Sequence, residues 1–403
     1  MMEAAVAERT FSPRPLEAVS AVPWLEQLRR AAFARFEELG FPTAHDEDWR
    51  YTGVQPITST AWLPARHDQE LRFLPPTGVR VRPLAQALHE AQPHLARIAG
   101  FEHNAFTALN TASFEDAIVL EIHPGAVITQ PIEIVLRSPN ADRPHVSHPR
   151  VLVLAGARSQ ASIVQTFTGE GRSFTNAVTE IALDEGAILE HTLFQRESET
   201  ACHVHALAVR QGRGSRFTSQ NVALGAALAR TDLHVALADE GAECGLYGLF
   251  VGKGTQHLDM HTTIDHASPR CLSRELYKGI LDGASRGVFF GRILVRKDAQ
   301  KTDAVQTNKN LLLSREALVN STPALEILAD DVKCRHGSTT GQLDAAALFY
   351  LRSRGIGEEA ARALLTWAFA ADVAERIRVP SVRADVEREL GLRLTGAPAA
   401  VPA

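Results

Sequence analysis

Residues 178–187 read VTEIALDEGA, a run rich in β-branched and apolar residues that ends in a Gly-Ala dipeptide. Gly-Ala or Gly-Ser dipeptides follow other such runs at Gly125-Ala126, Gly156-Ala157, Gly214-Ser215 and Gly241-Ala242. Successive glycines of this series are 27 to 31 residues apart, a period typical of solenoids. Glycine suits each position because a tight corner between strands needs a positive φ or a close backbone approach.

The runs that surround these glycines predict short strands, because β-branched and apolar residues favour a pleated, half-buried surface. They span 118–122, 132–136, 151–154 and 178–183. No helical stretch of ten or more residues separates the strands between Ala117 and Leu313, which argues against a doubly wound sheet. We therefore predict a mainly β fold with a solenoid core. A β-sandwich is the alternative, and only the repeat period favours stacked coils over it.

The N-terminal part of the chain has a helical pattern instead. Apolar residues between Val22 and Leu39 recur at helical spacing and predict an amphipathic helix that ends at Gly40. Prolines then interrupt residues 41–110, and prolines break helices and central strands alike. We expect a loosely built N-terminal domain.

Helical spacing returns after Leu343, where Gly355 and Gly357 divide two predicted helices. The Pro- and Ala-rich ending cannot pack a core and predicts a flexible tail. The expected organisation is an N-terminal helical domain (1–110), a solenoid core (111–343), a C-terminal helical domain (344–394) and the tail (395–403).

Composition and charge exclude several classes of protein. A formal charge of -5 with scattered Lys and Arg provides no basic field for phosphates, so nucleic acid is not an expected partner. No segment approaches the roughly 20 apolar residues that span a bilayer, and the first residues do not resemble a cleavable leader. We therefore expect a cytoplasmic protein without a membrane partner. The cysteines lie far apart and predict free thiols: Cys202, Cys244, Cys271 and Cys334.

The densest group of reactive side chains lies in residues 330–337, DDVKCRHG, which contain Cys334 and His336. In an extended chain these two side chains project from the same face. Thiolate and imidazole both bind iron or zinc, but two ligands are too few for a closed site, so a partner chain or a substrate has to complete it. The structural alternative is a buried free cysteine beside a hydrogen-bonded histidine.

Two other groups are weaker candidates for a metal. Cys202, His203 and His205 alternate along a predicted strand, with His191 expected on a neighbouring coil, although alternating histidines are more often part of a polar face. A looser group lies in a segment with two aspartates, Asp259 and Asp265, and is interpreted as a solvated loop rather than a metal site. Its members are His257, His261, His266 and Cys271.

Residues 248–254, GLFVGKG, superficially resemble a phosphate-binding loop. Only three residues separate Gly248 from Gly252, no Ser or Thr follows Lys253, and no helix follows to direct its N-terminus at a phosphate. The HExxH and GxGxxG signatures of common hydrolases and dehydrogenases are also absent from the sequence. We predict that the chain is no enzyme and that any ATP hydrolysis comes from another protein.

Several longer segments closely resemble the SufD branch of the SufB/SufD family. In the C-terminal half these are LLLS (311–314), TPALEI (322–327), ADDVKC (329–334), HG (336–337), GQLD (341–344) and FYLRSRGI (349–356). Near the other end, EDWRYT (47–52) resembles the acidic-Trp-basic-Tyr-Thr element of the same family. The resemblance covers nearly the whole chain.

This resemblance implies a right-handed parallel β-helix between helical domains, and a role as a scaffold subunit in iron-sulfur cluster assembly by the SUF system. It also implies a complex with the paralogue SufB, paired through the β-helices, and with two copies of the ABC ATPase SufC. The candidate contacts of the C-terminal helical domain with that ATPase are Phe349, Tyr350, Leu351 and Arg354. No cofactor is expected to stay bound to this chain alone, and the complex would hold a cluster transiently.

Within the family, SufB-type sequences carry a functional Cys shortly before the Leu-rich strand, where this chain has QTNKN (306–310). That difference, with the Lys-Cys-x-His-Gly element, favours a SufD-type partner over a SufB-type main scaffold. By motif match, the important histidine of the SufB and SufD interface is His336, with Cys334 beside it. Arg335 replaces the usual small residue between them and would depress the pKa of the thiol, attract a sulfide-bearing intermediate, or point into solvent from the opposite face.

Two functions of other classes stay open at this point. A β-solenoid enzyme acting on polysaccharide would need rows of aromatic and acidic residues, but only 6% of residues are aromatic and the acids do not pair obviously. A homodimeric scaffold without a metal role would form if edge strands paired with themselves.

Overall fold

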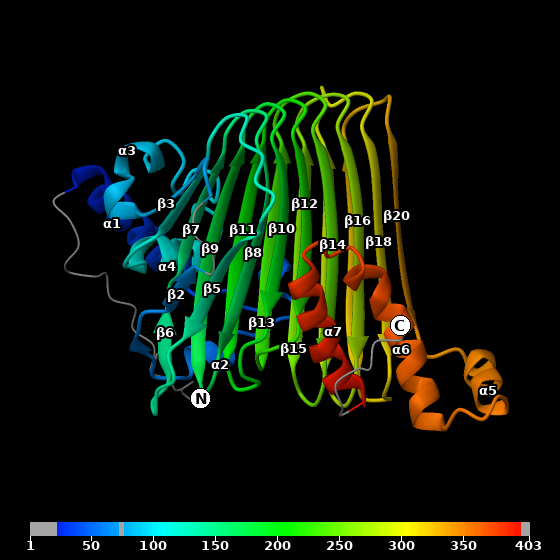
Figure 1. The fold of residues 1–403 in the computed structure, drawn as a ribbon. Coiled ribbons are helices and arrows are strands. Elements are labelled where there is room, and N and C mark those ends of the chain that lie inside the picture. The colour runs from blue at the N-terminus through cyan, green and yellow to red at the C-terminus, as the bar shows by residue number, and fades with distance from the viewer. Residues whose placement is uncertain (1–21, 72–75, 396–403) are drawn as a thin grey trace, which may run out of the picture.

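The computed structural model describes residues 22–71 and 76–395 of the chain (Figure 1). Strands dominate the structure and form a β-solenoid of about eight turns, with helices toward both ends. The predicted mainly β solenoid is confirmed, and the β-sandwich alternative is wrong. The predicted flexible tail lies outside the described residues except for its first residue.

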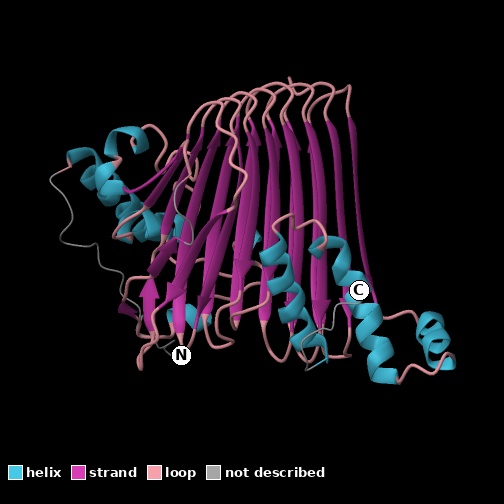
Figure 2. Cartoon of the chain, in the orientation of Figure 1, coloured by secondary structure: helices cyan, strands magenta, loops and turns pink. Residues whose placement is uncertain are grey.

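Two sheets form the walls of the solenoid, and from β7 on the longer strands alternate between them (Figure 2). Every strand pair is parallel except two antiparallel pairs near the N-terminus, β2 with β5 and β3 with β4. Sheet 1 contains, in spatial order, β19 (Leu318–Ile327), β17 (Arg286–Val295), β15 (His257–His266), β13 (Leu228–Leu237), β11 (Cys202–Gln211), β9 (Ser173–Leu183), β7 (Arg150–Ala155), β4 (Ile118–Ile122) and β3 (Val79–Pro83), with β1 (Leu63–Pro64) and β6 (His145–Ser147) beside this path. Sheet 2 contains β2 (Asp68–Leu71), β5 (Ile132–Ser138), β8 (Gln160–Gly169), β10 (Ile188–Gln195), β12 (Arg216–Ala223), β14 (Glu243–Gly252), β16 (Leu272–Leu281), β18 (Asp303–Leu312) and β20 (Lys333–Gly341).

In-register pairing stacks equivalent side chains on top of one another. Leu207 of β11 pairs with Leu233 of β13, and Val209 pairs with Val235, so apolar columns run along the solenoid axis. These side chains are almost fully buried and belong to one continuous interior cluster. Burial of apolar surface from both sheets therefore holds consecutive coils together.

The predicted glycine corners are present. Four of the five glycines have a positive φ: Gly125, Gly186, Gly214 and Gly241. At Gly156 an added Cβ would lie 2.8 Å from the Pro124 ring, so this glycine permits a close approach instead. In that coil the residue with a positive φ is Arg158. Its N–H donates to the Glu185 carbonyl of the next coil at 2.8 Å, and the N–H of Gly186 donates in the same way to the coil that follows.

The N-terminal region combines helices with strands that join the sheets. α1 spans Pro23–Leu39 and ends as predicted at Gly40, which has a φ of 62°. The remaining helices of this region are short: η1 (Glu47–Trp49), α2 (Gln55–Thr58), η2 (Leu84–Gln86), α3 (Leu88–Ala91) and α4 (Ala105–Ser113). Because β1, β2 and β3 also lie in this region and pair with later strands, the predicted domain boundary at residue 110 stays a prediction.

Three helices follow the solenoid: α5 (Ala345–Ser353), α6 (Glu358–Ala374) and α7 (Pro380–Thr395). The sequence predicted two, so α7 corrects that prediction. Three apolar residues of α7 are spaced four residues apart and are buried in a cluster with sheet 2 residues: Val382, Val386 and Leu390. The spacing of these three residues is helical, but the charged residues between them make the pattern difficult to recognise in the sequence. α6 and α7 lie over sheet 2, while α5 projects beyond the last coil (Figure 1).

Candidate site at the open end of the solenoid

The C-terminal end of the solenoid leaves two strand edges uncovered among the described residues. β19 is the last strand of sheet 1, and β20 is the last strand of sheet 2. Almost every side chain of β20 is exposed, and Leu318 and Ile327, at the two ends of β19, are 43% and 41% exposed. An exposed edge presents unpaired N–H and C=O groups to another chain. This end of the molecule therefore offers two strand edges to which another chain can pair.

Cys334 and His336 both lie on β20, in register with Ala304 and Gln306 of β18. Cys334 is half-buried and packs against the interior apolar cluster, and strand alternation gives His336 the same face. His336 is exposed. The structure thus places the two predicted side chains together on the last coil, at the open end.

Alternation places Arg335 on the opposite face from Cys334, and its side chain is exposed. Burial raises the pKa of the Cys334 thiol, and the charge of Asp303 adds to the increase. Arg335 is not among the groups that act on the pKa of this thiol, so the roles proposed for it stay predictions.

Polar side chains lie inside the coils beneath His336, next to the apolar cluster. Ser321 Oγ of β19 lies 2.7 Å from Ser338 Oγ of β20, so two hydroxyls bridge the sheets across the end of the solenoid. Ser321 also donates to Asn308 Oδ1 at 2.8 Å, and Asn308 is fully buried one coil below. Beside it, Gln306 donates to Glu275 at 2.8 Å. The sequence analysis missed these residues, because a polar side chain on the inner face of a strand has the same spacing as one on the outer face.

The second predicted metal site, Cys202, His203 and His205 with His191, consists of residues buried in the core. His203 and His205 are fully buried on β11, and both rings contact the ring of Phe167. His205 Nε2 lies 3.0 Å from the Thr179 hydroxyl, and burial lowers the pKa of His205 well below its ordinary value. His191 lies on the facing sheet, as expected for a neighbouring coil, and burial lowers its pKa to about 4.

His203 pairs with a buried carboxylate rather than with a group of metal ligands. Its Nδ1 lies 2.7 Å from Glu197 Oε2, and both side chains are fully buried. Burial alone would raise the pKa of Glu197, but His203 and hydrogen bonds from Thr175 and Gln195 outweigh burial and leave that pKa below its ordinary value. Cys202 is buried with a pKa raised to about 12, so its thiol is not reactive.

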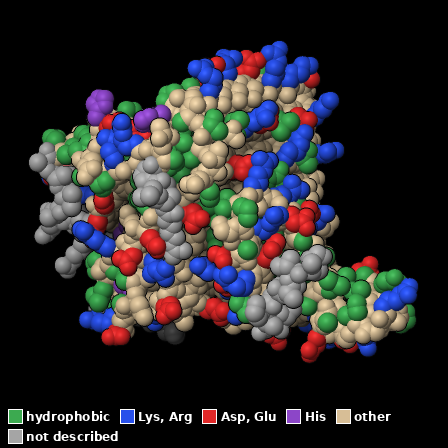
Figure 3. All heavy atoms as spheres, viewed as in Figure 1, with side chains coloured by type: hydrophobic (Ala, Val, Ile, Leu, Met, Phe, Trp, Pro, Cys, Tyr) green, Lys and Arg blue, Asp and Glu red, His purple; other side chains and the backbone are tan. Residues whose placement is uncertain are grey.

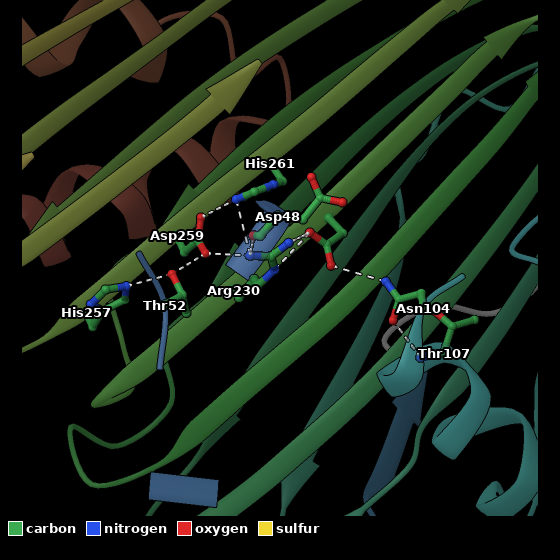
Figure 4. Close-up of polar contacts among 9 residues, drawn as sticks. Asp48, Thr52, Asn104, Thr107, Arg230, His257, Asp259 and His261 are labelled. Carbon is green, nitrogen blue, oxygen red and sulfur yellow. Dashed lines mark hydrogen bonds and ion pairs between the residues drawn. The ribbon is translucent and has the colours of Figure 1, made fainter. Parts of the chain in front are cut away.

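The third predicted group is not a solvated loop: its histidines lie on β15, and Cys271 is buried directly before β16. His266 faces the interior and lies 2.9 Å from the Ser273 hydroxyl. His257 and His261 face outward into a polar network with Asp259, drawn in Figure 4. Strand alternation separates the members, so the group forms no single site.

The network in Figure 4 attaches the EDWRYT segment to sheet 1. Arg230 of β13 is 2% exposed, donates to the Asp48 carbonyl at 2.6 Å and lies 3.8 Å from the centre of the Trp49 ring. Thr52 donates to Asp259 Oδ2 at 2.5 Å, and Arg230 donates to the same oxygen at 2.8 Å. This sequence element therefore has a structural role, since it fixes the N-terminal region on the solenoid.

The phosphate-loop resemblance is explained by packing. Gly248 lies on β14, and an added Cβ there would lie 2.1 Å from the Tyr277 ring of the next coil. The glycine makes room for that ring, which is almost fully buried. A strand and a corner follow it rather than a helix, so this segment offers no phosphate site.

Three of the predicted ATPase contacts lie on α5, and the fourth, Arg354, is its C-cap residue. Phe349 and Tyr350 are 74% and 55% exposed, Leu351 is partly buried, and the Arg354 guanidinium lies 5.1 Å from the centre of the Tyr350 ring. Figure 3 shows hydrophobic side chains on the lobe that projects at the lower right, where Figure 1 places α5. Exposed aromatic side chains on a projecting helix are typical of a protein interface.

Within residues 22–71 and 76–395, no three His, Cys, Asp or Glu side chains lie close enough together to hold a metal ion. None of the helices in this part of the chain is both long and apolar enough to cross a bilayer. Fold and site together define a β-solenoid protein whose exposed last coil carries one imidazole and one thiol.

Two family models match the sequence. Residues 136–369 match the SufBD core domain of the SUF system for FeS cluster assembly, and residues 15–63 match the SufBD protein N-terminal region. The chain therefore belongs to the SufBD family of SUF-system iron-sulfur cluster assembly proteins.

Individual relatives agree with the family models. An iron-sulfur cluster assembly SufBD family protein of Synechocystis sp. is 30% identical over 398 residues, which cover 88% of each chain. The iron-sulfur cluster assembly protein SufD of Escherichia coli is 27% identical over 381 residues, covering 89% of this chain and 90% of its own. The chloroplastic protein ABCI7 of Arabidopsis thaliana is 34% identical over 287 residues, covering 69% and 60%.

Proposed function

We propose that this chain is a SufD-type scaffold subunit without catalytic activity of its own. In this proposal the open end of its solenoid pairs with a SufB-like paralogue, and His336 helps to complete a site where nascent iron and sulfur are assembled. The observation that carries the proposal is the position of His336 and Cys334 on the uncovered last coil. Family membership favours this role over a carbohydrate-active solenoid. A cytoplasmic location stays a prediction.

Ligand number gives the reason for a partner. His336 and Cys334 supply one nitrogen and one sulfur, whereas closed iron or zinc sites in proteins take about four ligands. Residues from across the interface would complete the set, and the pairing of β19 and β20 with another chain would bury both side chains. The iron and sulfide are then cargo that the interface holds transiently, rather than a resident cofactor.

A SufD-type role is favoured over a SufB-type role by two observations. One relative that is similar over 89% of the chain is the SufD of Escherichia coli. In addition, the interior of β18 carries Gln306, Asn308 and Asn310 rather than a thiol. This chain would therefore contribute supporting ligands, and the paralogue would contribute the reactive thiol.

A SufC-like ATPase is the second proposed partner. α5 projects from the solenoid with Phe349 and Tyr350 exposed, and the phosphate-loop segment of this chain is a packed strand. ATP hydrolysis in the complex would thus come from the partner and would reach this chain through its C-terminal helices.

Replacing His336 with Ala tests the proposal in the complete complex. The complex is purified with the SufB-like and SufC-like subunits of the same organism and reconstituted anaerobically, and iron and sulfide are measured per complex. We expect the H336A complex to assemble normally but to hold at least about tenfold less cluster, as expected when a metal site loses a ligand or its support.

The matched control is His123→Ala, since His123 is also exposed but lies near the first glycine corner, far from the last coil. This variant should retain the wild-type iron and sulfide content. Equal cluster content in the H336A and wild-type complexes would remove His336 from the function.

A further inference from the structure

A column of three polar residues leads from the interior of the solenoid to His336. Glu275 of β16 pairs in register with Gln306 of β18, and Gln306 pairs with His336 of β20. In the opposite direction the column ends, because the register partner of Glu275 is the fully buried Leu246. The column is thus a polar segment two coils deep that opens only at the end of the solenoid.

The lower part of the column is fixed by a hydrogen bond. Gln306 Nε2 donates to Glu275 Oε2 at 2.8 Å, and the two side chains are 1% and 3% exposed. The Gln306 amide occupies space on sheet 1 that a side chain would otherwise fill, since an added Cβ at Gly291 would lie 2.5 Å from Gln306 Nε2. Gly291 therefore makes room for this amide in one position.

Burial makes an ionised Glu275 side chain energetically unfavourable at this position. Burial raises the pKa of its carboxyl to about 7, and the nearby Thr262 hydroxyl and the Gln306 amide only partly offset the effect of burial. The titratable groups on which the Glu275 charge acts, Cys244 and Tyr277, are themselves buried, and burial raises their pKa values, so they stay neutral. A buried carboxyl without a cationic partner among the described residues contributes little to stability, so its role has to lie in what it orients.

The upper part of the column has a free acceptor. Gln306 Oε1 is buried and has no hydrogen-bond partner among the described residues. Because the carboxyl of Glu275 accepts from the amide nitrogen, the carbonyl oxygen of the same amide is left to accept from another group. His336 is the register partner in the next coil, about 4.8 Å away along the sheet, which is the usual strand spacing.

We propose that Glu275 and Gln306 are positioning residues for His336. Glu275 orients the Gln306 amide, and the Gln306 carbonyl oxygen accepts a hydrogen bond from one ring N–H of His336, directly or through one water. That bond selects one neutral tautomer and directs the other ring nitrogen, with its lone pair, toward the partner chain. The proposal rests on the proposed function of His336, but its first test does not depend on iron.

The test uses the full-length chain with isotope-labelled histidine, in which nitrogen and carbon shifts report the tautomer of each ring. The His336 signals are assigned by their loss in the H336A variant. We expect one dominant tautomer in the wild type and a mixture in Gln306→Met, which keeps the volume but loses the carbonyl acceptor. The buried His191, several coils away, is an internal control and should not change.

Glu275 is tested with two substitutions of similar size. Glu275→Gln keeps an acceptor for the Gln306 amide and should retain both the wild-type tautomer and the wild-type cluster content in the complete complex. Glu275→Leu removes the acceptor, and we expect a mixed tautomer and about tenfold less cluster, the usual cost of losing a residue that orients a metal ligand.

An unchanged His336 tautomer in Gln306→Met and Glu275→Leu would overturn the proposal, and the E275Q variant shows whether the fold tolerates substitution at this position. A mixed tautomer with normal cluster content would support the positioning pair and would contradict the proposed function of His336 instead. The two claims are therefore separable.

Discussion

Burial of ionisable residues determines how this solenoid responds to pH. Burial lowers the pKa of His67, His191 and His266 to about 4, so these rings are neutral in the folded chain at pH 7. An unfolded chain binds protons at these rings below about pH 6.5, so the stability that depends on them is lost as pH falls from that value toward 4. The effect of Glu275 on stability changes with pH in the opposite direction, because burial raises its pKa to about 7.

The raised pKa of Glu275 predicts a pH-dependent difference between the wild type and Glu275→Gln. Below about pH 4.5 the carboxyl is neutral whether the chain is folded or not, whereas above pH 7 the folded chain holds a buried charge. At about 1.4 kcal/mol per pKa unit, the free energy of unfolding of E275Q relative to the wild type should rise by roughly 3 kcal/mol between these pH values.

Denaturant titrations of both proteins at several pH values measure this difference, and the histidines cancel because the two proteins share them. Parallel stability curves from pH 4.5 to 8 would mean that the carboxyl ionises freely in the folded chain.

Single residues of the candidate site were predictable only in part. Cys334 and His336 were predicted as a pair because alternation places them on one face, and motif similarity gave His336 its expected role. Glu275 and Gln306 were not predicted, since a sequence does not show which face of a strand is the inside of a solenoid. The same limit applies to His257 and His261, which were interpreted as loop residues and lie on a strand that packs against the N-terminal region.

At the scale of secondary-structure elements, the corners between strands show how much of the solenoid could be predicted from the glycine repeat. Four of the glycines in the repeat adopt the positive φ that made glycine the expected residue. Later corners use Arg270 and Lys301 at positive φ, and each donates its N–H to the next coil. The glycine period therefore ended at Gly241, although the solenoid continues for several more strands.

The exposed aromatic side chains of α5 predict that the proposed SufC-like ATPase binds at this helix. Replacing Phe349 and Tyr350 together with Ala should reduce the affinity of a SufC-like subunit at least about tenfold, because exposed aromatic side chains often dominate binding energy at interfaces. Pull-down or titration calorimetry with the purified ATPase measures the loss. The thermal stability of the chain should change little, since both side chains are exposed.

Leu392→Ala is the control, because Leu392 is an exposed apolar residue on α7 rather than α5. It should bind the ATPase as the wild type does. Equal binding by the double variant and the wild type would place the ATPase elsewhere on the chain.

The whole molecule is asymmetric along the solenoid axis. At the N-terminal end the antiparallel strands β2 and β3 close the sheets, and the helices α1 and α3 lie beside them (Figure 1). At the other end β19 and β20 have open edges, and their inner faces carry hydroxyl, imidazole and thiol groups beside the apolar Val319 and Leu325. Such an end is suited to meeting another chain around a polar centre, and less suited to lasting exposure to solvent.

Hydrogen exchange of the chain, alone at low concentration and in complex with the SufB-like paralogue, tests this account most directly. Amides at the outer edges of β19 and β20 should exchange quickly in the free chain and become protected in the complex, while β2 and β3 should not change. Unchanged exchange of β19 and β20 in a complex that is protected elsewhere would contradict it, because His336 would then lie outside the interface.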